Sequence, residues 1–270
     1  MKIALVYDRV NKWGGAERVL LALHEIWPEA PLYTAVYDVK RAPWASVFDV
    51  RPSFLQYFPL AKSHHELYPW LTQMAFESFS FDEFDVVISV TSAEAKAIIT
   101  KPGTLHMCYC LTPTRYLWSG YETYQETARG LVKHMHRWMV PKLRKWDLVA
   151  SSRPDYYIAI SQRVKDRIET YYKRSVEKVI YPPVDVQGRT IGKGDYFLVV
   201  SRLVGYKRID AIIRAFNALK LPLVIVGHGY AEGELRRLAG PKIRFVTDHL
   251  TEEELAAYYG NCRAFISMAD

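Results

Sequence analysis

Two cations, Arg202 and Lys207, are the residues best placed for chemistry on a phosphorylated substrate. They follow the apolar run Tyr196–Val200, whose composition predicts a buried strand. Arginine can hold a phosphate through two parallel hydrogen bonds, and lysine adds a point charge. Ligands of open α/β sheets bind beyond the carboxyl ends of the strands. The segment Ser201–Lys207 therefore predicts a pyrophosphate contact, with a solvated basic loop as the alternative.

Glycines stand where two other predicted strands end. Gly14 and Gly15 lie between the first strand and the first helix, and Gly227 and Gly229 follow the run Leu223–Val226. Glycine lets a backbone approach a phosphate closely, and a helix N-terminus attracts anions. The first pair does not form the dinucleotide motif G-x-G-x-x-G, and either pair can be a plain strand-to-helix turn. We interpret the first pair as a phosphate contact because it lies in the first βα turn.

The segment Tyr109–Trp118 leaves a further predicted strand and combines aromatic side chains with Arg115. Such a set suits a pocket for a sugar or a phosphate. The alternative is a loop that is packed by its own aromatic rings.

The segment Leu131–Trp146 predicts a basic amphipathic helix, because five Lys or Arg side chains accompany an apolar face that includes tryptophans. Such a helix can lie on an anionic membrane surface. The alternative is an ordinary surface helix whose apolar face packs on the core. Pro141 is expected to kink or split this helix.

The composition describes a folded chain with an anionic partner. Of the 270 residues, 50% are hydrophobic and 24% are charged, and the formal net charge is +7. Three cysteines are too few for a disulfide framework, and no Cys/His cluster completes a zinc site. No Asp-x-Asp motif occurs, which disfavours a metal-dependent sugar-nucleotide site of that type. The apolar run near the first residue is interrupted by a charged residue too early for a signal peptide. No apolar run approaches the roughly 20 residues of a membrane span. We therefore expect a cytoplasmic protein.

Strand-like apolar runs alternate with helix-like amphipathic segments along the whole chain. This alternation predicts an α/β protein of two doubly wound, Rossmann-like domains with parallel sheets. The stretch Gln187–Gly194 is interpreted as a linker, which divides the chain into residues 1–186 and 187–270. The second domain ends at Asp270 after its fourth predicted strand, where a Rossmann-type sheet commonly has about six, so we expect it to be incomplete. Strands are expected at Lys2–Tyr7, Leu32–Tyr37, Phe84–Val90, Leu105–Cys110, Tyr157–Ile160, Val179–Tyr181, Tyr196–Val200, Leu223–Val226, Ile243–Val246 and Ala264–Ile266, and the longer helices within Glu66–Phe79, Tyr121–Trp146 and Gln162–Tyr172.

Several motifs together resemble family 4 of the retaining nucleotide-sugar glycosyltransferases, enzymes of the GT-B fold with two Rossmann-like domains. The matching segments are Gly14–Val19, Ser201-Arg202-Leu203 with Lys207, and the strand and turn Val224–Gly229. Two further segments, Tyr109–Trp118 and Tyr181–Asp185, look closest to the bacterial O-antigen mannosyltransferase branch. The resemblance spans the whole chain.

The resemblance implies transfer of a hexose, with retention, from a nucleotide sugar such as GDP-mannose to a lipid-linked polysaccharide acceptor. Arg202 and Lys207 would stabilise the leaving diphosphate. No metal, no cofactor beyond the donor substrate and no nucleic acid is implied. The protein would act in the cytoplasm, peripherally at the inner face of the membrane. The implied donor-binding residues are Gly14, Gly15, Ser201, Gly227, Gly229, Val246 and Thr247, and the acceptor-side residues are Tyr109, Thr112, Arg115 and Tyr116.

Two departures from the family leave other functions open. Leu111 stands where members commonly carry a histidine, and leucine can neither hydrogen-bond a sugar hydroxyl nor carry a proton. The family's paired glutamates would follow Asp270, so we expect the 270-residue chain to have little transferase activity. The alternatives are a non-catalytic sugar-nucleotide-binding or scaffold protein and a nucleotide-sugar epimerase of the same architecture.

Overall fold

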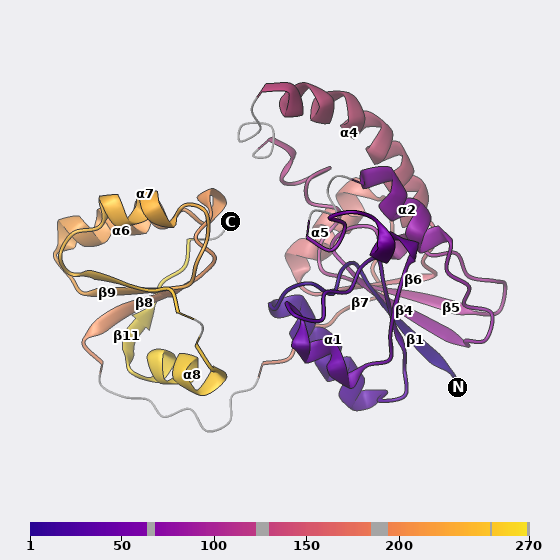
Figure 1. Ribbon diagram of the computed structural model, residues 1–270, viewed down its shortest axis with the longest axis horizontal. Coiled ribbons are helices and arrows are strands. Elements are labelled where there is room, and N and C mark those ends of the chain that lie inside the picture. Colours follow the sequence, from indigo (N-terminus) through magenta and orange to yellow (C-terminus); the bar gives the residue numbers. More distant parts are fainter. Residues whose placement is uncertain (64–67, 123–129, 185–193, 249, 269–270) are drawn as a thin grey trace. The chain divides into compact units, whose positions relative to one another are not determined.

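The computed structural model describes residues 1–63, 68–122, 130–184, 194–248 and 250–268, without the side chains of residues 130–137 and 252 (Figure 1). The chain divides into two compact units, Met1–Val184 and Asp185–Asp270. Each unit is an α/β body with its own sheet and its own apolar core, and each is described by itself.

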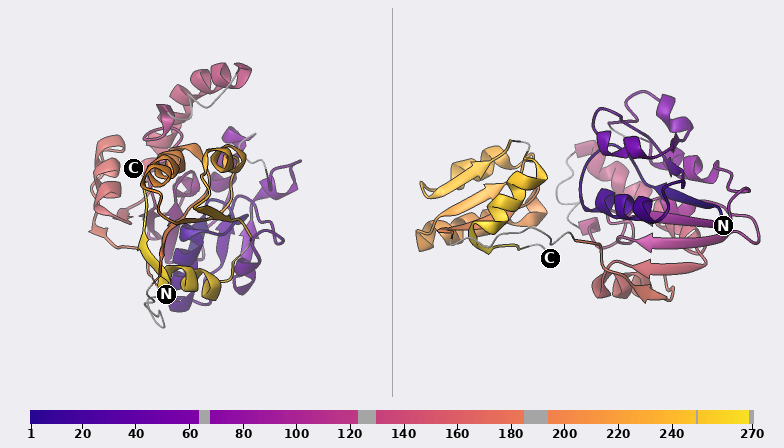
Figure 2. Two further views of the ribbon diagram at one scale, coloured as in Figure 1. Left: turned by 90° about the vertical axis from the view of Figure 1, so that its left-hand side faces the viewer. Right: turned by 90° about the horizontal axis from the view of Figure 1, so that it is seen from below.

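Unit 1 contains a seven-stranded sheet in the order β3-β2-β1-β4-β5-β6-β7, with every neighbouring pair parallel. In Figure 2 the magenta and pink arrows of the later strands point the same way. The order reverses between β1 and β4, as it does in a doubly wound sheet. The strands are β1 (Ile3–Tyr7), β2 (Leu32–Thr34), β3 (Val50–Pro52), β4 (Val86–Thr91), β5 (Leu105–Cys110), β6 (Tyr156–Ala159) and β7 (Lys178–Val179).

Helices cover both faces of this sheet because its strands are apolar on both faces. Along β1, Leu5 and Tyr7 pack with the helix α1, whereas Ala4 and Val6 pack on the opposite side with the helices α2 and α4. This alternation follows from the two-residue period of a strand. The helices are α1 (Gly15–Ile26), α2 (Pro69–Glu77), α4 (Gly130–Ser151) and α5 (Gln162–Tyr171), with short 3₁₀ turns η1 (Pro43–Val47), η2 (Phe54–Tyr57) and η4 (Ala95–Ala97).

Unit 2 contains a four-stranded parallel sheet in the order β10-β9-β8-β11. One apolar cluster joins this sheet to α6 and α7, and a second cluster on the opposite face joins it to α8 (Figure 1). A capping box between Thr251 and Glu254 starts α8. The elements are β8 (Tyr196–Val200), η5 (Gly205–Lys207), α6 (Ile209–Leu219), β9 (Leu223–Val226), α7 (Glu232–Leu238), β10 (Ile243–Val246), α8 (Glu252–Gly260) and β11 (Cys262–Phe265).

The main differences from the sequence prediction lie in three elements. The edge strand β3 was not expected, because a three-residue strand with an outward Arg51 has no apolar run. The strand predicted at Leu32–Tyr37 ends at Thr34. The basic helix extends past Trp146 to Ser151, and Pro141 lies inside it without ending it. Within the described residues no helix is both long and apolar enough for a membrane span.

A buried histidine in β5 makes the stability of unit 1 depend on pH. His106 is fully buried, its Nε2 shares a hydrogen bond of 2.9 Å with Ser89 Oγ, and its Nδ1 has no partner in the described structure. Burial, with a smaller effect of the nearby Arg153 guanidinium, lowers the pKa of His106 from 6.5 to about 3. The unfolded chain therefore binds a proton below pH 6.5 that the folded unit cannot bind.

We expect unit 1 to lose stability as the pH falls from about 7.5 to about 4.5, and His106→Gln to remove about 2–3 kcal/mol of that loss. The glutamine amide can keep the bond to Ser89 but cannot be protonated. The measurement is urea unfolding followed by tryptophan fluorescence, which reports on unit 1 because all seven tryptophans lie there. His24→Gln, which replaces a half-buried histidine of α1 in the same unit, serves as the control. An unchanged pH dependence in His106→Gln would contradict this account.

Candidate functional site

Two loops at the carboxyl edge of the unit 2 sheet lie side by side. The backbone continues the strand pairing beyond β8 and β9, because Ser201 N donates to Val226 O at 3.0 Å and Leu203 N donates to His228 O at 3.0 Å. The end of β10 joins them, since Gly227 N donates to Val246 O at 2.9 Å. These bonds hold the predicted donor-side residues of unit 2 at one edge of one sheet.

Gly227 and Gly229 are required by this packing. A Cβ on Gly227 would lie 2.1 Å from Ser201 O, and one on Gly229 would lie 2.2 Å from Leu203 O. Gly227 also has a φ of 134°, a conformation that side-chain-bearing residues rarely adopt. Glycine is therefore needed at both positions because two protein loops approach each other closely. This packing agrees with the alternative in which the motif is a strand-to-helix turn.

Arg202 and Lys207 are brought together around Tyr206. The Arg202 guanidinium donates to the Tyr206 hydroxyl at 2.5 Å, and Lys207 Nζ lies 5.6 Å from the centroid of the Tyr206 ring. The 3₁₀ turn η5 that carries Lys207 is anchored by Gly205 N, which donates to the Tyr230 hydroxyl at 3.2 Å. No carboxylate in the described part of the chain forms an ion pair with either cation. Two positive charges at a strand end are thus available to an external anion.

Val246 and Thr247 border the same edge. Val246 ends β10, and the Thr247 hydroxyl lies 3.5 Å from Arg236, which donates to it. Together with Ser201, these residues lie at the same carboxyl edge of the unit 2 sheet as the two cations. The arrangement can bind a phosphate or diphosphate group.

The glycine turn of unit 1 contains a carboxylate of its own. Glu17 lies in the first turn of α1, is 1% exposed, and accepts a hydrogen bond of 2.5 Å from the Tyr7 hydroxyl. A Cβ on Gly14 would lie 3.2 Å from the Glu17 carboxylate, whereas Gly15 has open space around it. Burial and the Glu17 charge raise the pKa of Tyr7 well above its ordinary value. Because Glu17 repels an anion, this turn is a poorer phosphate site than the loops of unit 2.

The four predicted acceptor-side residues lie at or beyond the end of β5 but have different surroundings. The Tyr109 hydroxyl donates to Ile180 O at 2.8 Å, and the Tyr116 hydroxyl donates to Glu94 at 2.8 Å. Burial and the Glu94 carboxylate raise the pKa of Tyr116 well above its ordinary value. Arg115 is exposed, and the hydroxyl of Thr112 is buried without a partner in the described structure. Both phenols therefore serve internal contacts, while Arg115 faces outward.

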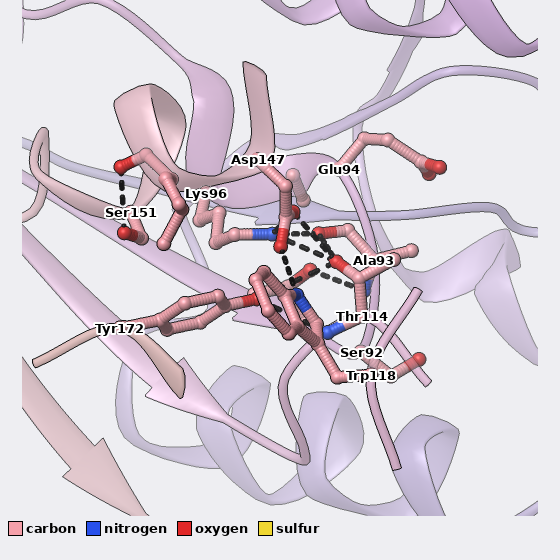
Figure 3. Close-up of polar contacts among 12 residues, drawn as sticks. Ser92, Ala93, Glu94, Lys96, Thr114, Trp118, Asp147, Ser151 and Tyr172 are labelled. Carbon is pink, nitrogen blue, oxygen red and sulfur yellow. Dashed lines mark hydrogen bonds and ion pairs between the residues drawn. The ribbon is translucent and has the colours of Figure 1, made fainter. Parts of the chain in front are cut away.

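A buried ion pair that sequence analysis missed holds the loop that follows β5 (Figure 3). Lys96 Nζ lies 2.6 Å from Asp147 Oδ1 in α4, and both side chains are at most 2% exposed. Thr114 donates to the same carboxylate at 2.8 Å, and the Trp118 indole donates to it at 2.7 Å. Burial alone disfavours the ammonium, but Asp147 holds the pKa of Lys96 above its ordinary value. The pair thus fixes the position of the Thr114–Trp118 segment.

A second missed residue, Asp8, organises the end of β4. Its carboxylate accepts from the Thr91 hydroxyl at 2.7 Å and from the backbone N–H groups of Ser92 at 2.8 Å and Ala95 at 2.9 Å. The neighbouring Arg9 pairs with Glu94. The sequence held a signal for this contact, because polar residues directly follow the two apolar strands β1 and β4. The carboxyl ends of these neighbouring parallel strands meet at one edge of the sheet.

Comparison with known protein families finds no matching family, and no curated protein matches the sequence. Solved structures do match. The structure of Anabaena HepE in complex with UDP is 15% identical, with a TM-score of 0.66 over 98% of this chain and 73% of that chain. Sucrose-phosphate synthase from Thermosynechococcus elongatus is 12% identical, with a TM-score of 0.63 over 98% and 75%. An α-glucosyltransferase in complex with UDP is 11% identical, with a TM-score of 0.53 over 100% and 74%.

At these identities the likeness shows the fold alone. The chain shares the fold of GT-B glycosyltransferases, and the prediction of an α/β protein with Rossmann-like domains is confirmed.

We expect Lys96→Met to lower the free energy of unfolding of unit 1 by about 3–5 kcal/mol, because it leaves Asp147 buried without a counter-charge. The double variant Lys96→Met/Asp147→Asn should be less destabilised than the sum of the single variants, by more than about 1 kcal/mol. Tryptophan fluorescence during urea unfolding measures all three. Lys165→Met, which removes a surface pair with Glu169, is the control and should change stability by less than about 1 kcal/mol. Strict additivity would show that the two charges do not stabilise each other.

Proposed function

We propose that the protein is a glycosyltransferase that moves a sugar from a nucleotide-sugar donor to an acceptor hydroxyl. The observation that carries the proposal is the pair Arg202 and Lys207, which has no carboxylate ion-pair partner in the described structure and lies at the carboxyl edge of the unit 2 sheet. The fold supports it, because the chain shares its fold with glycosyltransferases, and the HepE and α-glucosyltransferase structures hold UDP.

The two cations would act on the leaving group. In the transfer, the bond from the anomeric carbon to the donor diphosphate breaks, a bond to the acceptor oxygen forms, and the proton of the acceptor hydroxyl passes to the departing diphosphate. Negative charge grows on the diphosphate oxygen as its bond breaks. Arg202 can hold two phosphate oxygens at once, and Lys207 adds a point charge. Because these side chains supply the counter-charge, the proposed site needs no metal ion and no cofactor beyond the donor.

The finer identity of the substrates is also part of the proposal. The resemblance of the sequence favours a hexose transferred with retention, mannose from GDP-mannose, and a lipid-linked polysaccharide acceptor. The UDP in two structures of the same fold makes uridine donors the first competitors to test. Val246 and Thr247, at the end of β10, would border the base, and the loop after β5 with Arg115 and Tyr116 would serve the acceptor.

In an active form of the protein, Arg202→Ala and Lys207→Ala should each lower kcat/KM by roughly 10²–10³ with little change in thermal stability, because loop cations stabilise charge and hold no core. Release of nucleoside diphosphate from GDP-mannose and UDP-sugars measures the rate, and titration with GDP and UDP should show affinity falling about tenfold or more. EDTA should leave the rate unchanged. Arg214→Ala, on the exposed face of α6, is the control. Unchanged rates and affinities in both variants would refute the assignment.

A second candidate is a non-catalytic protein that binds a nucleotide sugar. The observation that favours it is Leu111, which packs against the apolar cluster on the α1 side of the sheet and offers no acid, base or hydrogen-bond donor on its side chain. Donor binding without turnover in any acceptor mixture would support this candidate. Conversion of the donor sugar without an acceptor would indicate an epimerase instead.

Peripheral membrane binding through α4 is a further part of the proposal. Of the predicted amphipathic segment, Val140 and Leu143 are buried in unit 1, and the side chains of residues 131–137 lie outside the described part. Trp138 is 60% exposed, and Lys142 Nζ lies 3.7 Å from the centroid of its ring. An exposed tryptophan beside a cation suits the interface of an anionic membrane.

Sedimentation with phosphatidylglycerol vesicles should therefore carry the protein down at low salt and less of it as salt rises, since exposed charges are screened. Trp138→Ala should weaken this binding, whereas Trp70→Ala, at another exposed tryptophan of unit 1, should not. Neutral phosphatidylcholine vesicles give the baseline. If the protein ignores anionic vesicles even at low salt, α4 has only a structural role.

A further inference from the structure

A pocket of about 360 Å³ lies in unit 1, between α5 and the loop that follows β5. Its walls combine cationic, hydroxyl and aromatic side chains with a single carboxylate. The lining residues are Ser119, Arg163, Asp166, Arg167, Thr170 and Tyr171. Neither the sequence motifs nor the proposed donor site involves this pocket.

Positive charge gathers in the pocket without being neutralised. Arg163 and Arg167 lie one turn apart on α5, and neither forms an ion pair with a carboxylate among the described residues. Burial, the Arg163 charge and the more distant Arg115 charge lower the pKa of Arg167, with Tyr171 acting in the opposite direction. The one carboxylate, Asp166, accepts from the Gln162 amide at 3.1 Å. Two guanidinium groups and one carboxylate therefore line the pocket.

The loop that contributes Ser119 to the opposite wall is held by several contacts. Gly120 N donates to Arg115 O at 2.9 Å, and a Cβ on Gly120 would lie 2.9 Å from Arg115 Cγ, so the glycine lets the Arg115 side chain fold over the loop. The Trp118 ring stacks on the Tyr171 ring, with centroids 5.3 Å apart and an interplanar angle of 23°. The Trp118 indole is in turn bonded to Asp147 (Figure 3). The buried ion pair of unit 1 thus holds an aromatic wall of the pocket.

We propose that this pocket binds a phosphate or diphosphate group. Two guanidinium groups can each bind phosphate oxygens through paired hydrogen bonds, and the Ser119 and Thr170 hydroxyls can donate further ones. A bound anion would offset the mutual repulsion of the arginines. Assigning the phosphate to the acceptor, as the group that joins its sugars to a lipid carrier, rests on the proposed function, whereas the anion site itself does not.

The test uses the Arg202→Ala/Lys207→Ala variant, in which the proposed donor site of unit 2 is removed. Inorganic pyrophosphate and geranyl diphosphate are titrated into it by calorimetry at low ionic strength. Both should still bind, and adding Arg163→Gln and Arg167→Gln should weaken both by about tenfold or more. Adding Lys165→Gln and Lys173→Gln instead removes the same charge outside the pocket lining and should leave both affinities unchanged. Tighter binding of geranyl diphosphate than of pyrophosphate would identify a lipid carrier, and equal binding a free anion.

The outcomes separate this inference from the proposed function. Arg163→Gln/Arg167→Gln in the otherwise unchanged protein should keep its affinity for UDP and GDP, and Arg163→Lys/Arg167→Lys should restore part of the diphosphate binding with an unchanged melting temperature. If the glutamine substitutions leave diphosphate affinity as it was, or if the Lys165 and Lys173 substitutions weaken it equally, the pocket is not an anion site. Loss of UDP binding in Arg202→Ala/Lys207→Ala but not in Arg163→Gln/Arg167→Gln would support the proposed function. It would leave the inference about the pocket unchanged.

Discussion

The arrangement of unit 1 depends on one buried ion pair between Lys96 and Asp147. The two residues lie 51 positions apart in the sequence and join the turn after β4 to the long helix α4. Two buried charges are tolerated only when they pair and their remaining hydrogen-bonding capacity is met. Thr114 and Trp118 meet that capacity by donating hydrogen bonds to Asp147. Movement of the loop after β5 would therefore leave the buried carboxylate without these partners. The outward-facing Arg115 is presented from a loop that is held in this way.

Two groups of charged residues differ in their partners. Inside unit 1, Asp8, Glu94 and Asp147 each accept hydrogen bonds from groups of the chain itself, and their charges stabilise the ends of the parallel strands. At the surface, Arg202 with Lys207 in unit 2 and Arg163 with Arg167 in unit 1 form no ion pair within the described residues. Neutralised charges build the scaffold, whereas charges without a counter-charge are available to ligands.

Close backbone packing explains the glycines after β9. Gly227 and Gly229 face the carbonyl oxygens of Ser201 and Leu203 at distances that admit no side chain. Their contribution to a donor site is therefore indirect: they let the loop that carries Arg202 pack against its neighbour. The same reasoning applies to Gly120, whose missing side chain leaves space for Arg115. In each case the missing side chain leaves room for the segment that carries a cation.

The sequence by itself determined the α/β class, the parallel strands and the position of Arg202 and Lys207 at a strand end, because these follow from local periodicity and from the rule that binding loops follow strands. Only the tertiary structure decided which charges are neutralised. Nothing in the local sequence pairs Lys96 with Asp147, brings Arg115 near Arg167, or places Glu17 beside the Tyr7 hydroxyl. Those contacts depend on which strand ends become neighbours and how deeply each side chain is buried, and both are properties of the folded chain.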